Sequence, residues 1–95
     1  MANEKVQYPT TVESAVRLLQ GLVPSAEQEK IIWMTEAELA GLHQGLGQWI
    51  RNNLGLWGQN MELLEATGER NADDASSVII RAFWSALRDG LPKVH

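Results

Sequence analysis

The sequence predicts an all-α protein, a compact bundle of four to five helices without a sheet. Apolar residues recur every three or four positions in several segments, which is the spacing of one face of an α-helix. No segment alternates apolar and polar residues, and no Asn-Gly hairpin signal occurs. The 95 residues are enough for one core. We therefore expect one helical domain over residues 9–91, with tails at residues 1–8 and 92–95.

The first helix is expected over residues 11–22. Thr10 or Thr11 can cap its N-terminus, and acidic and small residues follow in the first turn. Its apolar residues recur at helical spacing to the end of the segment: Val12, Ala15, Val16, Leu19, Leu22 and Val23. Pro24 then ends it, because proline cannot continue a helix.

Two capping-box patterns divide the next segment. Ser25 and Gln28 have the spacing of one box, and Thr35 and Glu38 have the spacing of another. A second N-cap implies that the chain breaks near Met34. The sequence thus predicts a short second helix and a new third helix.

The third helix is predicted to be the longest, ending near residue 53. On a wheel of about 100° per residue, Arg51 lies opposite the apolar stripe and Asn53 lies close to its centre. The stripe consists of Leu39, Leu42, Leu46, Trp49 and Ile50, with Leu54 at its edge. Gly41, Gly45 and Gly47 weaken a helix, so we expect a neighbouring backbone to approach them closely or the helix to be mobile.

Two more helices complete the prediction. Asn60 can cap a short fourth helix that Thr67 and Gly68 end. The last helix is expected over residues 73–89, with Gly90 as its stop. Its apolar stripe is unusually wide, which indicates either central packing or a face for self-association.

Composition excludes several classes of function. The formal net charge of −4 argues against nonspecific binding to nucleic acid and against anionic membrane surfaces. The sequence contains no cysteine, no secretory signal and no apolar stretch of membrane-spanning length. We expect a cytoplasmic protein with no cofactor.

No constellation of residues indicates catalysis or metal binding. His43 and His95 are the two histidines, and the positions three and four after His43 are Leu46 and Gly47, which cannot bind a metal. His43 is either a histidine at the edge of the core or a site residue that changes charge near neutral pH. Acid–base chemistry by His43 with Asp73 or Asp74 is a weaker alternative.

The stretch W-I-R-N-N-L-G-L-W, residues 49–57, allows two interpretations. In the first, the helix ends near Asn53 and Trp57 folds back over its end. In the second, Arg51 and Asn52 or Asn53, together with Trp57 and Asn60, form a polar pocket for a carboxylate, phosphate or peptide backbone. An ion pair from Arg51 to one of the aspartates that begin the last helix, Asp73 and Asp74, is a further hypothesis.

The segment M-T-E-A-E-L-A-G-L-H-x-G-L-G-x-W-I-R-N-N-x-G-L-W, residues 34–57, resembles the signature of a small bacterial domain family of unknown function. Residues 73–84 resemble its second block, and P-T-T-V-E-S-A-V-R-L-L resembles its first helix. Gln44 departs from the aromatic residue of that family at this position. The resemblance implies a compact helical domain and no particular activity. If the family shares a site, the matching residues are His43, Trp49, Arg51, Asn52, Trp57, Asn60 and Asp74.

We therefore expect a non-enzymatic, acidic helical protein that binds a protein partner. A regulatory or inhibitory role is the natural form of such binding, including in a phage or defence context. The alternative is a protein that binds a nucleotide or other small anion in a pocket around Arg51, Asn52 and Trp57. Self-association through the last helix is a separate expectation.

Overall fold

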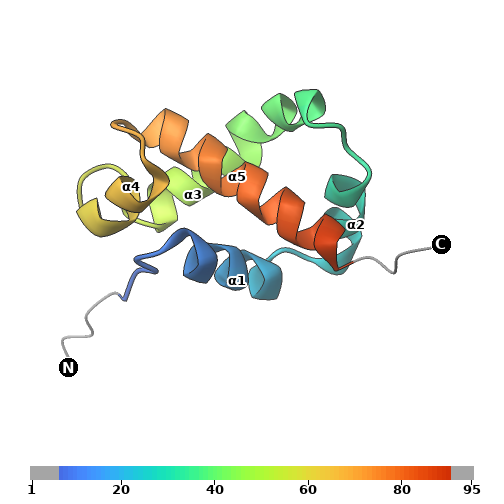
Figure 1. The fold of residues 1–95 in the computed structure, drawn as a ribbon, viewed down its shortest axis with the longest axis horizontal. Coiled ribbons are helices and arrows are strands. Elements are labelled where there is room, and N and C mark those ends of the chain that lie inside the picture. The colour runs from blue at the N-terminus through green and yellow to red at the C-terminus, as the bar shows by residue number, and fades with distance from the viewer. Residues whose placement is uncertain (1–6, 91–95) are drawn as a thin grey trace.

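The longest helix, α5 (Ala72–Asp89), lies in the middle of the molecule, and the other helical elements pack around it (Figure 1). The computed structural model describes residues 7–90. These residues form helices joined by loops and contain no strand, as predicted. Ile79 and Phe83 of α5 are fully buried. The wide apolar stripe is thus accounted for by central packing, because α5 contacts elements on several sides.

The boundaries of the two predicted tails lie at the limits of the described residues. Residues 1–6 and 91–95 lie outside them, and these include the whole predicted C-terminal tail and all of the N-terminal tail except residues 7 and 8. Tyr8 is half-buried, and its ring lies against Gly55.

The first helix, α1 (Val12–Leu22), begins as the sequence predicts. The backbone N–H of Ser14 donates to Thr11 Oγ1 at 3.0 Å, and the N–H of Thr11 donates to Ser14 Oγ at 3.2 Å. This reciprocal pair satisfies two of the free N–H groups at a helix start. Ala15 and Leu19 are fully buried, so the predicted face of α1 packs on the core.

The capping box predicted for the second helix, α2 (Ser25–Ile32), is wrong. The helix begins at Ser25 itself, so the serine is one position too late to cap it. The Gln28 amide instead donates to the carbonyl oxygens of Gln20, at 2.9 Å, and Val23, at 2.8 Å. Gln28 therefore stabilises the end of α1 rather than the start of α2.

The far end of α2 is tied to the last turns of α5. The Trp84 indole N–H donates to the Met34 carbonyl oxygen at 3.0 Å, and the Arg88 guanidinium donates to that of Ile32 at 2.8 Å. The guanidinium also lies over the Trp84 ring, 5.2 Å from its centroid. These contacts fix α2 beside α5 across a sequence separation of fifty residues or more.

The predicted third helix is one continuous helical stretch of three different geometries, and it is not the longest helix. A 3₁₀ segment η1 (Ala37–Leu42) leads into a π segment η2 (His43–Gly47) and then into α3 (Gln48–Asn53). The capping box at its start is confirmed. The N–H of Thr35 donates to Glu38 at 2.8 Å, and that of Glu38 donates to the threonine hydroxyl at 3.3 Å.

The change of geometry moves the buried face along by one residue. A π segment has a wider turn than an α-helix, so a wheel of constant pitch goes out of phase beyond it. From the last residue of η2 onward, the buried residues of the stretch are Gly47, Ile50, Arg51 and then Leu54. The predictions for Arg51 and Asn53 are therefore wrong, since Arg51 is buried and Asn53 is exposed. Trp49, predicted in the stripe, is 39% exposed.

Close approach of a neighbouring backbone, one of the two reasons predicted for the glycines of this stretch, is not found at them. A Cβ atom on Gly41 or Gly45 would meet no atom of a neighbouring segment within 4 Å, so close packing does not explain them. A Cβ on Gly47 would lie 3.0 Å from Arg51 Nη1. Gly47 thus leaves room for a buried side chain of its own helix rather than for a neighbouring backbone.

The fourth helix, α4 (Met61–Thr67), has the predicted cap at each end. The Asn60 side chain accepts from the N–H of Leu63 at 3.3 Å. Gly68 ends the helix in the left-handed conformation, with φ of 79°. Gly90, by contrast, follows α5 in a right-handed conformation. The end of α5 therefore does not require the left-handed conformation that favours glycine.

Gly55 offers a direct test of the turn between α3 and α4. We expect Gly55→Ala to lower the free energy of unfolding by about 2 kcal/mol. The residue has φ of 76°, and a Cβ atom would lie 2.8 Å from Asn60 Cβ and 3.0 Å from the Tyr8 ring. The matched control is Gly68→Ala, where φ is 79° but the space is open, and the expected loss is about 1 kcal/mol. Equal losses in urea unfolding would show that the packing of Tyr8 on this turn contributes nothing.

Candidate functional site

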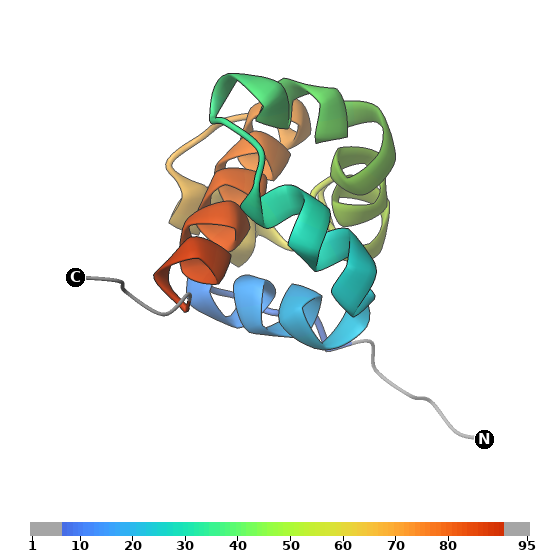
Figure 2. The ribbon, with the colours of Figure 1, turned by 90° about the vertical axis from the view of Figure 1, so that its right-hand side faces the viewer.

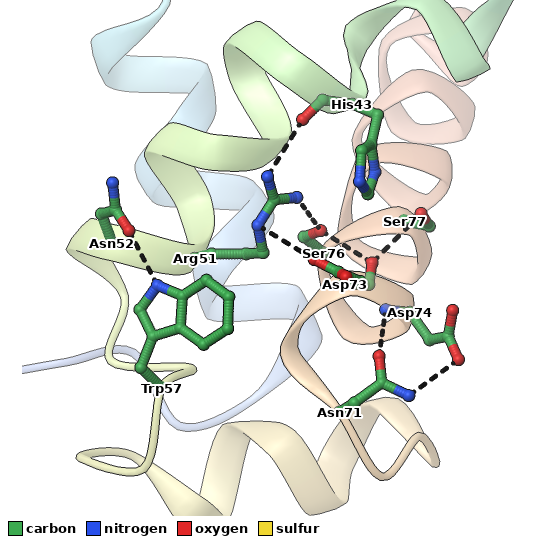
Figure 3. A network of polar contacts seen from close by, with 9 residues as sticks. All are labelled: His43, Arg51, Asn52, Trp57, Asn71, Asp73, Asp74, Ser76 and Ser77. Atoms are coloured by element: carbon green, nitrogen blue, oxygen red, sulfur yellow. Dashed lines mark hydrogen bonds and ion pairs between the residues drawn. The ribbon is translucent and has the colours of Figure 1, made fainter.

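The Arg51 guanidinium lies inside the protein and is held from three directions (Figure 3). Nη1 donates to Ser76 Oγ at 3.0 Å, and Nη2 donates to the His43 carbonyl oxygen at 3.4 Å. Nε lies 3.4 Å from Asp73 Oδ1, which is close enough for an ion pair but is not aligned as a hydrogen bond. Only 6% of Arg51 is exposed. Its guanidinium therefore links α3, which carries it, to η2 and α5.

The predicted ion pair to the start of α5 is confirmed, and Asp73 is the partner. Asp74 has a different role. Its backbone N–H donates to the Asn71 side-chain oxygen at 2.8 Å, and its carboxylate accepts from the Asn71 amide at 3.0 Å. Both carboxylates lie in the first turn, where the helix dipole favours negative charge.

Asn52 and Trp57 form a pair on the outside of the molecule. The indole N–H donates to Asn52 Oδ1 at 2.7 Å, while Trp57 remains 58% exposed (Figure 3). The α-helix ends at Asn53, and Gly55 follows in the left-handed conformation. The helix-ending interpretation of this stretch is therefore confirmed. Trp57 contacts the last turn without burying it.

Asn60 is a buried asparagine whose hydrogen-bonding groups are occupied. Its amide donates to the carbonyl oxygens of Pro9 at 2.8 Å and Leu54 at 2.9 Å, and its oxygen caps α4. These bonds join the entry to α1, the end of α3 and the start of α4. A side chain so occupied has little capacity for a ligand.

Two clefts of the described chain lie elsewhere, and neither is lined by Arg51, Asn52, Trp57 or Asn60. The first, which we name the apolar groove, has a volume of about 570 Å³. Its lining residues come from the α1–α2 corner and from the η1–η2–α3 stretch, whose ribbons Figure 2 shows. Its lining is mostly apolar: Leu19, Leu22, Val23, Pro24, Ile31, Met34, Leu42, Gly45, Leu46 and Trp49, with Glu27 and Lys30.

The second cleft, which we name the His43 cleft, has a volume of about 720 Å³ and lies between η1 and α5. Leu39 and Ile80 are the buried residues of its lining. The rest of its lining consists of Glu36, Ala37, Ala40, His43, Gln44, Ser77 and Arg81. Of the seven predicted site residues, Trp49 thus lines one cleft and His43 lines the other.

Sequence reasoning missed Leu22 and Arg81, which belong to these clefts. Leu22 is 54% exposed although it continues the apolar stripe of α1. An apolar residue two positions before a helix-ending proline is a signal that could have pointed to it. Arg81 carries no comparable signal, because an arginine on an exposed helix face is ordinary.

The described part of the chain offers no group of three histidine, aspartate or glutamate side chains placed to hold a metal ion. None of the helices in residues 7–90 is both long and apolar enough to cross a membrane. The comparison with protein families is more informative. The model of a domain of unknown function, DUF6794, matches residues 8–87.

The chain belongs to the DUF6794 family. This confirms the resemblance to an uncharacterised domain family. No curated protein and no solved structure matches the chain. The match covers both clefts and the Arg51 network, so all three lie within the family domain.

Proposed function

We propose that the protein is a non-enzymatic binding protein that receives an apolar, positively charged helical segment of a protein partner in its apolar groove. The observation that carries this proposal is the groove itself. Leu22 of α1 and Trp49 of α3, which are 54% and 39% exposed, line it together with the buried Leu19 and Ile31. A groove of apolar side chains is how many proteins receive one face of an amphipathic helix.

The aromatic and aliphatic sides of the groove supply the affinity. Covering an apolar surface releases water, which contributes about 25 cal/mol of favourable free energy per Å² of buried apolar area. Trp49 adds a large rigid ring, a side chain of the type on which binding energy concentrates. Its exposure is a consequence of the π segment η2, which turns the tryptophan out of the core.

The net charge argues for a cationic partner. Most of the described cations are already engaged: Lys30 with Glu27, Arg51 with Asp73, Arg81 with Glu36, and Arg88 with Trp84. The surplus carboxylates, which give the chain its formal charge of −4, are left to attract positive charge from outside. An amphipathic segment with lysine or arginine on its outer face fits both features.

The expectations of a cytoplasmic location and of a regulatory or inhibitory role, including in a phage or defence setting, form part of this proposal. Masking a basic helix of another protein is inhibition by occupancy, which requires no catalytic group. Self-association through α5 receives less support, since α5 is surrounded by other elements. A second copy in the groove is an outcome that the experiment below distinguishes.

The test uses the four tryptophans as reporters. Protein labelled with 5-fluorotryptophan is titrated with a synthetic leucine–lysine peptide of helical spacing, followed by ¹⁹F NMR. We expect the Trp49 resonance to move, while Trp57 and Trp84, which do not line the groove, stay in place. Leu22→Glu is expected to weaken binding at least tenfold, because it places a carboxylate in an apolar contact.

The matched control is Leu18→Glu, which alters a neighbouring turn of α1 at a residue that is 37% exposed and outside the groove. It should bind the peptide as the natural protein does. A peptide of the same composition in scrambled order should not move Trp49. The proposal fails if the scrambled peptide binds equally, or if sedimentation shows a dimer that Leu22→Glu dissociates and that excludes the peptide.

A further inference from the structure

We propose that the His43 cleft is a second, independent site, which binds a small organic carboxylate carrying an apolar body. At about 720 Å³ the cleft has the size of a small-molecule site, for which about 300–1,000 Å³ is typical. Its lining combines buried apolar residues with a set of hydrogen-bond donors on two different elements, η1–η2 and α5.

The apolar part of the cleft consists of Leu39 and Ile80, which are 7% and 3% exposed. Ala37 and Ala40 of η1 widen it, because their side chains are too short to fill the space. A flat apolar group can cover these residues, and water released from them favours its binding. The cleft therefore selects for a ligand with a hydrocarbon body.

The donors come from Arg81, His43 and Gln44, whereas the Ser77 hydroxyl already donates to the Asp73 carbonyl oxygen at 3.3 Å. Arg81 Nε is 3.0 Å from Glu36 Oε2, which leaves its two Nη groups without an ion-pair partner among residues 7–90. The His43 ring likewise has no hydrogen-bond partner in the described chain, although its backbone oxygen accepts from Arg51. His43, from η2, and Ser77, from α5, both line the cleft, and Figure 3 labels the two side chains.

A carboxylate fits this set better than a neutral group. A guanidinium presents two parallel N–H donors that match the two carboxylate oxygens, and such charge-assisted bonds are among the strongest in proteins. Glu36 currently occupies one side of Arg81. The two side chains are 58% and 62% exposed, so this ion pair contributes little and can be exchanged for a ligand carboxylate at small cost.

Glu36 thus acts as an internal competitor, which yields an expectation with a defined sign. Removal of its charge should strengthen carboxylate binding, by about threefold for an exposed pair. Removal of the Arg81 charge should weaken binding at least tenfold. If the cleft does not bind carboxylates, neither substitution will change carboxylate affinity in this way.

The experiment is a titration of ¹⁵N-labelled protein with sodium benzoate, with benzamide and inorganic phosphate as comparison probes. Benzoate should shift amide resonances of residues 36–44 and 77–81, whereas benzamide and phosphate should bind at least tenfold more weakly. Glu36→Gln should tighten benzoate binding and Arg81→Gln should weaken it. Arg70→Gln, outside the cleft, should leave the affinity unchanged.

Because the substituted side chains are exposed, we expect each variant to fold. A thermal unfolding midpoint equal to that of the natural protein will show this. Absence of a benzoate shift at millimolar concentration overturns the proposal. Equal binding of benzamide or phosphate does so as well, and so does weaker binding by Glu36→Gln. Leu22→Glu, which alters the apolar groove, should not change the affinity for benzoate. The proposal for this cleft and the proposal for the apolar groove are therefore tested independently.

Discussion

Arg51→Ala is expected to lower the free energy of unfolding by about 3 kcal/mol. The guanidinium is buried and bonds to Ser76 Oγ and the His43 carbonyl oxygen, so its removal leaves polar groups without partners inside the protein. It also leaves a void beside Gly47, where an added Cβ would lie 3.0 Å from Arg51 Nη1. A charge-reversing Arg51→Glu should prevent folding, since a buried carboxylate would face the Asp73 carboxylate and the His43 carbonyl.

Urea unfolding followed by circular dichroism measures this loss. The informative comparison is Asp73→Asn, which removes the charged partner but leaves the buried bonds of Arg51 in place. Because 62% of the Asp73 side chain is exposed, we expect a loss of less than about 1 kcal/mol. If Asp73→Asn were as damaging as Arg51→Ala, the ion pair rather than the buried hydrogen bonds would hold the arginine.

Asn60→Asp is expected to cost about 2–3 kcal/mol although aspartate caps helices as well as asparagine does. The oxygen that caps α4 is retained, but the amide that donates to the Pro9 and Leu54 carbonyl oxygens becomes a carboxylate oxygen. Three oxygens then face one another where 6% of the residue is exposed. The loss should diminish at low pH, where the carboxyl is protonated and donates again.

Asn71→Asp provides the matched control for this substitution. Asn71 also caps a helix, at the start of α5, but it is exposed and contacts only its own first turn among the described residues. We expect a change within about 1 kcal/mol. A large loss at Asn71 and none at Asn60 would show that the cap of α5, and not the junction of three segments, limits stability.

The local rules of capping and periodicity predicted most of this fold. Thr11, Asn60 and Gly68 act at helix ends as their residue types suggest, and the reciprocal bonds of Thr35 and Glu38 are present. These features depend on neighbouring residues alone. The ion pair between Arg51 and Asp73 was also anticipated, although its burial was not.

The remainder depends on tertiary packing. The π segment η2 has no distinct sequence pattern, yet it rotates everything after His43, buries Arg51 and exposes Trp49 and Asn53. The polar residues of W-I-R-N-N that looked like a pocket are consequently divided between the interior and the surface. The two clefts join residues distant in sequence, such as Leu22 with Trp49 and His43 with Arg81, which no local spacing can bring together.

We infer that Arg51 is part of the architecture, and we propose that ligands bind at other surfaces. Arginine side-chain ¹⁵N–¹H NMR tests this central claim directly, with phosphate and benzoate added in turn. We predict that the Arg51 Nε–H exchanges with water far more slowly than that of the exposed Arg17 and does not shift with either anion. Rapid exchange at Arg51, together with a shift on adding phosphate, would contradict the claim and make W-I-R-N-N the binding site.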